Sequence, residues 1–313
     1  MSLSRRSFLE AAVLTPLWAD NKIPRRILGR TGVQVSILAF GCGSRLLAYK
    51  HEDQALEALT YALDRGVNYL DTAYGYGNGL SETWVGRLMP QRRRDVFLAT
   101  KVNARKADDA MRIIEGSLQR LKTTQVDLLH IHSLTSEEDL AAIEAPDGVL
   151  KAVYRARDEK MARFIGITCH SDPVVLKKAL ERHDFDCTQM ALNAARAGMQ
   201  KGRGALGEPV GDTFEAVALP VAKKKNLGVI AMKIFAQDGL AGKAPAEKLI
   251  RYSLSLPVAT AVIGMPKLEF VEQNLAVVRS FRPMSLEEME QISGELRVHK
   301  AELDRFFAQH VDV

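Results

Sequence analysis

The sequence predicts an α/β fold, a (β/α)8 TIM barrel with an N-terminal β-hairpin cap and an extra C-terminal helix. Short apolar runs typical of buried strands alternate with amphipathic helical segments eight times, which is the pattern of a closed parallel sheet. Three successive runs also end in an ionisable residue, namely Asp71, Lys101 and His132. These residues are about 30 positions apart, the length of one strand–helix unit. We therefore expect them to meet at one end of the barrel.

Each element of this barrel can be assigned in chain order. Residues 25–35 alternate around the turn residues Gly29 and Gly32 and predict the hairpin that caps the bottom of the barrel. Apolar runs predict strands at residues 37–41, 67–73, 96–101, 126–132, 162–168, 187–193, 228–233 and 260–264. Helical patterns predict helices at residues 53–65, 108–121, 173–183, 213–225, 244–255 and 267–278. Residues 285–307 are expected to add the C-terminal helix.

The composition fits a single domain over residues 23–313. A chain of 313 residues with 47% hydrophobic content can bury one large core. The net charge of +5 is mild, and its basic clusters at residues 92–94 and 223–225 favour a solvated face over nucleic-acid binding. No apolar run reaches the roughly 18 residues of a membrane span. The three cysteines lack the spacing of a disulfide framework or a thiolate metal site, and no GxGxxG follows the first strand.

Residues 71–82 carry the candidate chemistry. Asp71 ends a strand, and Tyr74 and Tyr76 follow on a glycine-rich turn whose backbone can approach a ligand. A phenol can donate a proton, but its ordinary pKa of about 10 is too high for efficient acid–base chemistry at neutral pH. A neighbouring cation lowers that value. Lys101, on the adjacent strand, is placed to be this cation, and Asp71 can keep it charged.

The four residues Asp71, Tyr76, Lys101 and His132 resemble the Asp-Tyr-Lys-His tetrad of the aldo-keto reductases. The flanking words DTAxxYGNGxSE, LATK and DLxxIH are also similar to those of the family, and the resemblance extends from about residue 25 to about residue 281. It implies that Tyr76 protonates a carbonyl oxygen as hydride reaches the carbon, and that His132 hydrogen-bonds the substrate carbonyl. His130 is expected to fill the layer beneath His132.

The resemblance also implies a set of cofactor-binding residues: Thr168, Cys169, Gln189, Met232, Gly264, Lys267 and Asn274. Thr168 and Cys169 stand where a Ser-Asn pair usually grips the nicotinamide carboxamide, and Gln189 matches the family glutamine. Met232 replaces an aromatic residue against the ring. Asn274 would contact adenine.

The implied cofactor is NADP(H), with NAD(H) as the alternative. Gly264 and Phe270 occupy positions where the family carries basic residues for the 2′-phosphate, and Lys267 is the nearest cation. The implied activity is reversible hydride transfer to an aldehyde or ketone, a small-molecule substrate, without a metal. The alternative function is a nucleotide-binding regulatory protein of the same family with little turnover.

Substrate specificity is expected in the loops at residues 43–50, 134–148 and 194–211 and in the tail after residue 281. Arg196, Met199 and Arg203 indicate a pocket of mixed polar and apolar character. No heptad pattern or hydrophobic edge indicates an oligomeric state.

Residues 1–22 are expected to be separate from the barrel. Residues 4–10, with Arg5 and Arg6, resemble a twin-arginine export signal, and residues 11–19 would form its short apolar region. The alternative is a tail without an export function, which leaves the protein in the cytoplasm. Export would remove the protein from a supply of reduced nicotinamide, so that a bound nucleotide would have to cycle in place.

Overall fold

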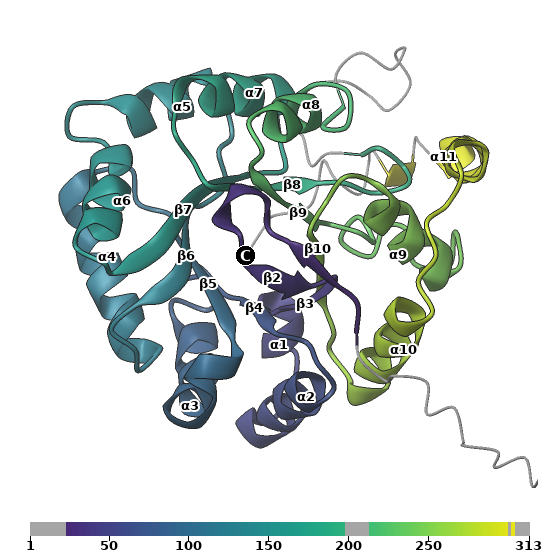
Figure 1. Ribbon diagram of the computed structural model, residues 1–313, viewed down its shortest axis with the longest axis horizontal. Helices are drawn as coiled ribbons and strands as arrows, with labels where there is room; N and C mark the ends of the chain where they lie inside the picture. The colour runs from purple at the N-terminus through teal and green to yellow at the C-terminus, as the bar shows by residue number, and fades with distance from the viewer. Residues whose placement is uncertain (1–22, 198–212, 300–301, 304–313) are drawn as a thin grey trace, which may run out of the picture.

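The structure, a computed structural model that describes residues 23–197, 213–299 and 302–303, confirms the predicted barrel (Figure 1). Eight parallel strands close in the order β10-β3-β4-β5-β6-β7-β8-β9. They are β3 (Leu38–Gly41), β4 (Tyr69–Asp71), β5 (Phe97–Val102), β6 (Val126–Ile131), β7 (Ala162–Cys169), β8 (Cys187–Ala191), β9 (Gly228–Met232) and β10 (Thr260–Gly264). Every predicted strand is present. The carboxyl ends of all eight strands therefore face the same side of the molecule.

Helices surround this ring of strands (Figure 1). They are α1 (Ser44–Leu47), α2 (Glu52–Asp64), α3 (Leu80–Arg92), α4 (Ala107–Arg120), α5 (Glu137–Glu144), α6 (Val149–Asp158), α7 (Pro173–Arg182), α8 (Ala218–Lys224), α9 (Ala246–Ser255), α10 (Leu268–Arg279) and α11 (Leu286–Leu296). Among the helices of the described residues, none combines the length and apolarity that a membrane crossing requires.

Helices α1, α3, α5 and α6 lie outside the segments predicted as helical. Helix α3 buries the polar residues Ser81 and Glu82 in its first turn, and only its later part buries apolar side chains, Val85 and Met89. Helix α5 lies within the expected loop 134–148. It begins because the Ser136 side chain accepts a hydrogen bond from the Asp139 amide. Within the predicted C-terminal segment 285–307, α11 ends at Leu296, a 3-10 turn follows over Arg297–His299 and residues 302–303 are again helical, while residues 300–301 and 304–307 lie outside the described residues.

The predicted hairpin cap is formed by β1 (Arg25–Ile27) and β2 (Gln34–Ser36), which pair antiparallel. It lies at the amino-terminal end of the strands, where Figure 1 shows it in front of the strand ring. Asn68, just before β4, holds it there. The Asn68 side chain accepts from the Ser36 amide at 2.7 Å and donates to the Gln34 carbonyl at 3.1 Å.

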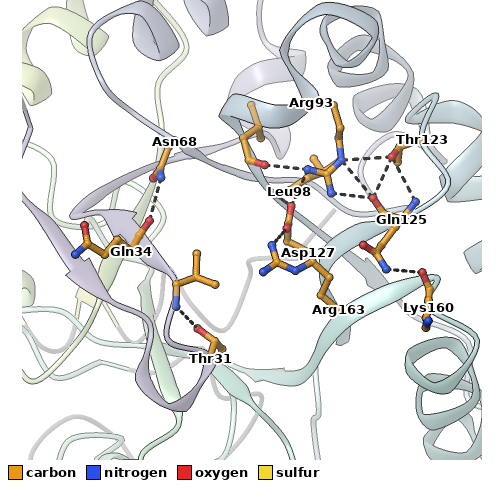
Figure 2. A network of polar contacts seen from close by, with 12 residues as sticks. Thr31, Gln34, Asn68, Arg93, Leu98, Thr123, Gln125, Asp127, Lys160 and Arg163 are labelled. Carbon is orange, nitrogen blue, oxygen red and sulfur yellow. Dashed lines mark hydrogen bonds and ion pairs between the residues drawn. The ribbon is translucent and has the colours of Figure 1, made fainter.

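A buried carboxylate ties three strands together at this same end (Figure 2). Asp127 of β6 is almost fully buried and accepts hydrogen bonds from the Leu98 amide of β5 and from Arg163 of β7, at 2.9 and 2.6 Å. Arg93 lies 2.8 Å from the same carboxylate and also donates to the Gln125 carbonyl. Because every one of these contacts lies far from the carboxyl ends of the strands, the network holds the scaffold and leaves the opposite end free for chemistry.

Candidate active site

The structure brings Asp71, Lys101 and Tyr76 into direct contact at the carboxyl ends of the strands. Asp71 ends β4 and pairs in register with Ala99, so Lys101 extends one inward-facing step further along β5. Lys101 Nζ donates to Asp71 Oδ2 at 2.8 Å, to the Thr72 carbonyl at 2.9 Å and to Tyr76 Oη at 3.1 Å. An ammonium group has three protons, so each has an acceptor.

Burial sets the electrostatics of this contact. Lys101 is 1% exposed and Asp71 is 2% exposed. Burial alone would lower the pKa of Lys101, but the Asp71 carboxylate and the Tyr76 oxygen together raise that pKa above its ordinary value. Lys101 is therefore positively charged. A cation at hydrogen-bond distance stabilises negative charge as it develops on the phenol oxygen.

His132 follows β6 and faces the same tyrosine. The rings of Tyr76 and His132 meet edge to face, with centroids 5.6 Å apart and an angle of 85°. Gly75 lies between them and a neighbouring loop, and a Cβ on it would come within 3.7 Å of His132 Nδ1. All four tetrad residues predicted from the sequence are thus gathered at one place.

Tyr74 and His130, which lie close to the tetrad in the sequence, do not take part in its contacts. The ring of Tyr74 lies against the Arg120 guanidinium, 5.0 Å from its carbon, and not against Lys101. His130 is fully buried below His132, and Gly166 makes room for it, since a Cβ there would lie 2.6 Å from His130 Nδ1. Burial, with a smaller effect of the Lys101 charge, lowers the pKa of His130 well below its ordinary value. His130 is consequently a neutral imidazole in the barrel interior.

A cleft opens beside Asp71 and Tyr76 and shows features that fit a nicotinamide. It is lined by Gly41, Gly43, Ser44, Arg45, Gln189, Met232, Lys233, Ile234, Phe235, Gln237, Asp238, Val262, Ile263 and Gly264. Gln189 donates to Asp71 Oδ2 at 3.1 Å, while Gln189 Oε1 and Asp71 Oδ1 are buried without a hydrogen-bond partner among the described residues. Unsatisfied buried acceptors are rare and costly. A carboxamide N–H is a donor that could satisfy them.

The comparisons with known proteins agree with this geometry. The sequence model of the Aldo/keto reductase family matches residues 38–248. The chain belongs to the aldo/keto reductase family. L-galactose dehydrogenase of Arabidopsis thaliana is 26% identical over 85% of this chain and 92% of the relative. An uncharacterized oxidoreductase of Bacillus subtilis is 35% identical over 69% of this chain and 68% of the relative.

Solved structures show the same fold. A holo-form aldo-keto reductase of Bacillus halodurans has a TM-score of 0.70 at 25% identity and covers 87% of this chain and 96% of that chain. An aldo-keto reductase of Klebsiella pneumoniae, solved in complex with NADPH, has a TM-score of 0.67 at 22% identity and covers 93% and 99%. These relatives, together with the family match, establish an oxidoreductase of the aldo/keto reductase family.

The cofactor residues expected from the family resemblance divide into two groups. Gln189, Met232 and Gly264 line the cleft beside Asp71 and Tyr76. The others lie away from its lining: Thr168, Cys169, Lys267 and Asn274. The first three residues are thus placed beside the tetrad, and the cofactor contacts of all seven stay predictions.

Cys169 is the clearest departure from the family pattern. Its inward-facing neighbour Thr168 accepts a hydrogen bond from the Ser133 amide at 2.7 Å. Since side chains alternate along a strand, Cys169 faces the helices. It is fully buried, with its sulfur 3.4 Å from both the amide and the carbonyl of Asp172. Burial raises the pKa of Cys169 to about 12, so its thiol is neutral and lies outside the cleft.

Helix α10 carries the two remaining residues. Lys267 is the exposed N-cap residue of α10 and its side chain makes no capping bond. Asn274 lies further along the same helix and is 6% exposed. The position of Lys267 is compatible with a contact to an adenosine phosphate, because a helix N-terminus attracts anions, whereas Asn274 lies in the second turn of the helix.

A pair of residues that spans the cleft was missed from the sequence. Arg45, after β3, forms an ion pair with Asp238, after β9. Gly264 allows this arrangement, since a Cβ there would lie 2.8 Å from the Arg45 side chain. Only closure of the barrel brings these loops together, and the one available signal was the position of Arg45 in an expected specificity loop.

Arg196 does not form the polar pocket side chain that was expected. It forms ion pairs with Glu215 and Glu290 and donates to Tyr252 Oη at 3.1 Å. It therefore joins the loop after β8 to helices α9 and α11. Met199 and Arg203, which were expected beside it, lie outside the described residues.

Proposed function

We propose that this aldo/keto reductase catalyses reversible hydride transfer between a nicotinamide nucleotide and an aldehyde or ketone, with Tyr76 as the general acid and base. The observation that carries the proposal is the 3.1 Å contact of Lys101 Nζ with Tyr76 Oη. A partly buried phenol in contact with a buried, charged lysine, beside a cleft with unsatisfied acceptors, is poorly suited to a purely structural role.

Each tetrad residue has a distinct part in this mechanism. Bound nicotinamide supplies the hydride in reduction and accepts it in oxidation. Tyr76 donates its phenolic proton to the carbonyl oxygen, and Lys101 stabilises the negative charge left on the phenol oxygen. Asp71 keeps Lys101 charged and in place. His132 donates a hydrogen bond to the carbonyl oxygen and so holds the substrate beside Tyr76.

For the cofactor we propose NADP(H), held at the adenosine end by Asn274 and by Lys267 at the N-terminus of α10. NAD(H) is the second candidate, favoured by Gly264 and Phe270, which carry no charge. Binding of NADPH and NADH to the wild type and to Lys267→Ala separates them. Under the proposal the variant loses affinity for NADPH about tenfold, as expected when a phosphate contact is removed, and keeps its affinity for NADH. Equal losses would contradict it.

The catalytic proposal is tested by comparing the wild type with Tyr76→Phe on a panel of aldehydes, ketones and reducing sugars. Sugars belong in this panel because one relative carries the name L-galactose dehydrogenase. We expect turnover to fall by at least about a thousandfold in the variant while nucleotide affinity persists. Equal rates in both proteins would remove Tyr76 from the mechanism.

The nucleotide-binding regulatory function remains the second candidate. It is favoured because Cys169, an expected contact of the nicotinamide carboxamide, does not line the cleft. Tight nucleotide binding without turnover on the whole panel, in wild type as well as in Tyr76→Phe, would support this function. It would also contradict the reductase proposal, because both proteins would then behave alike.

We further propose that residues 1–22 act as a twin-arginine export signal, separate from a single barrel domain over residues 23–313. Replacement of Arg5 and Arg6 by lysine should keep the protein in the cytoplasm, as judged by cell fractionation. Identical distributions of the variant and the wild type would refute export by this pathway.

A further inference from the structure

A buried carboxylate next to the tetrad has no part in the proposed mechanism. Glu82, in the first turn of α3, is fully buried. Its two oxygens accept hydrogen bonds from Thr100 Oγ1 at 2.5 Å and from Arg120 Nε at 2.8 Å. Burial of a carboxylate is unfavourable unless it is paired and hydrogen-bonded, so this arrangement needs both partners.

Arg120, from the end of α4, lies against the loop that carries Tyr76. Its guanidinium lies 5.0 Å from the centre of the Tyr74 ring, at the start of the loop. At the other end Gly79 has a φ of 90°, and a Cβ on it would lie 2.5 Å from Arg120 Nε. The loop is closed by the Gly79 amide, which donates to the Tyr74 carbonyl at 2.7 Å. Arg120 therefore contacts both ends of the loop.

Glu82 is also linked to Lys101, the other member of the catalytic pair, through Thr100 of strand β5. Thr100 immediately precedes Lys101 in β5. The chain of contacts thus passes from the lysine strand through Thr100 and Glu82 to Arg120, and from Arg120 to the tyrosine loop. The loop itself is rich in glycine and offers few side chains of its own for packing.

We infer that Glu82 and Arg120 are positioning residues, whose ion pair holds the loop of residues 74–79 so that Tyr76 Oη meets Lys101 Nζ. This inference rests on the proposed function of Tyr76. Neither residue lines the cleft, so both act through the loop. The charged or titratable groups that face Tyr76 itself are Asp71, Lys101 and His132, with Arg45, Lys233 and Asp238 in the same cleft.

Arg120→Met tests the inference, because methionine retains an apolar stem and removes the guanidinium. We expect kcat to fall by roughly ten- to a hundredfold, the effect of misplacing a catalytic group by about 1 Å. The affinity for the nucleotide should stay unchanged, and the pH at which kcat titrates should move upward as Tyr76 leaves its cation. Arg120→Lys should recover part of kcat, since lysine can still pair with Glu82.

Arg112→Met is the matched control. Arg112 lies on the same helix α4, is 71% exposed and pairs only with Asp109 among the described residues. It should behave as the wild type. The double variant Glu82→Gln with Arg120→Met should lose no more activity than Arg120→Met alone, because the two residues act as one unit. Additive losses would show that they act separately and would overturn the inference.

A second measurement does not depend on turnover. In protein labelled with ¹³Cζ-tyrosine, the Tyr76 resonance is identified by its loss in Tyr76→Phe. We expect it to titrate at a higher pH in Arg120→Met than in the wild type, even if no substrate is turned over. Unchanged titration and an unchanged kcat in folded Arg120→Met would overturn the positioning role, whereas absent turnover with a shifted resonance would overturn only the proposed function.

Discussion

Replacement of Lys101 by methionine tests the centre of the proposed mechanism. The ammonium nitrogen lies 3.1 Å from Tyr76 Oη. At an effective dielectric constant of about 20, unit charges at this distance attract each other by about 5 kcal/mol. A tenfold rate change corresponds to about 1.4 kcal/mol, so Lys101→Met should slow hydride transfer by roughly 10³- to 10⁴-fold.

The same substitution also leaves Asp71 buried without its cation. Removal of one partner from a buried ion pair costs about 3–5 kcal/mol of unfolding free energy. The double variant Lys101→Met with Asp71→Asn removes both charges and should recover most of this stability. It should not recover the rate, because the cation beside Tyr76 is still missing. Stability and catalysis are thereby separated.

The assay is single-turnover oxidation of bound reduced nicotinamide, followed by its absorbance, with denaturant unfolding of the same samples. Two results would refute the reasoning. One is a rate for Lys101→Met within tenfold of the wild type. The other is a double variant whose rate recovers along with its stability, which would mean that Lys101 only maintains the fold.

Three further outcomes are expected elsewhere in the barrel. Arg105 donates to the carbonyl of His132 at 3.0 Å and pairs with Asp139, so Arg105→Met should lower kcat about tenfold and also lower the unfolding free energy, measured by steady-state kinetics and denaturation; a change in stability alone would contradict this. Asp127→Asn should lower the unfolding free energy by about 3 kcal/mol and leave kcat unchanged, and an equal fall in kcat would show that the two ends of the barrel are coupled. His130 has a lowered pKa when folded, so its contribution to stability is complete above about pH 6.5 and is lost as the pH falls towards the folded pKa. The unfolding free energy of the wild type, measured by denaturation, should therefore fall by at most about 1.4 kcal/mol per pH unit between pH 7 and pH 5. The fall should be smaller in His130→Leu, and an equal fall in both proteins would contradict this role of His130.

Much of the barrel and of its candidate centre could be predicted because the signals are local in the chain. Buried strands are apolar runs, and the repeat length carries Asp71, Lys101 and His132 to the same end of neighbouring strands. The side of a strand on which a residue lies is also local information. At Cys169, however, the prediction followed the family motif and not the alternation of side chains along the strand. Alternation from Thr168 alone would have placed that thiol towards the helices.

Other features depend on the closed barrel and left little signal in the sequence. Arg45 and Asp238 come from loops nearly two hundred residues apart and meet only when β10 pairs with β3. Helix α3 escaped prediction because it buries Ser81 and Glu82 where an ordinary helix buries apolar residues. The polar first turn of α3 lies behind the tyrosine loop, whereas the rest of its inner face buries Val85 and Met89.

Two of the unsatisfied buried polar atoms of the described residues lie at the cleft, while others, such as Tyr69 Oη and both ring nitrogens of His130, lie elsewhere in the barrel. At the bottom, both oxygens of Asp127 have partners, and behind the tyrosine loop both oxygens of Glu82 do. At the cleft, Asp71 Oδ1 and Gln189 Oε1 are buried without partners among the described residues. Each such acceptor costs about 1–3 kcal/mol, a penalty that a fold selected only for stability would remove. A ligand that donates hydrogen bonds to both oxygens removes the penalty on binding, so the nucleotide should raise the melting temperature of the wild type more than that of Gln189→Leu, which lacks one of these acceptors.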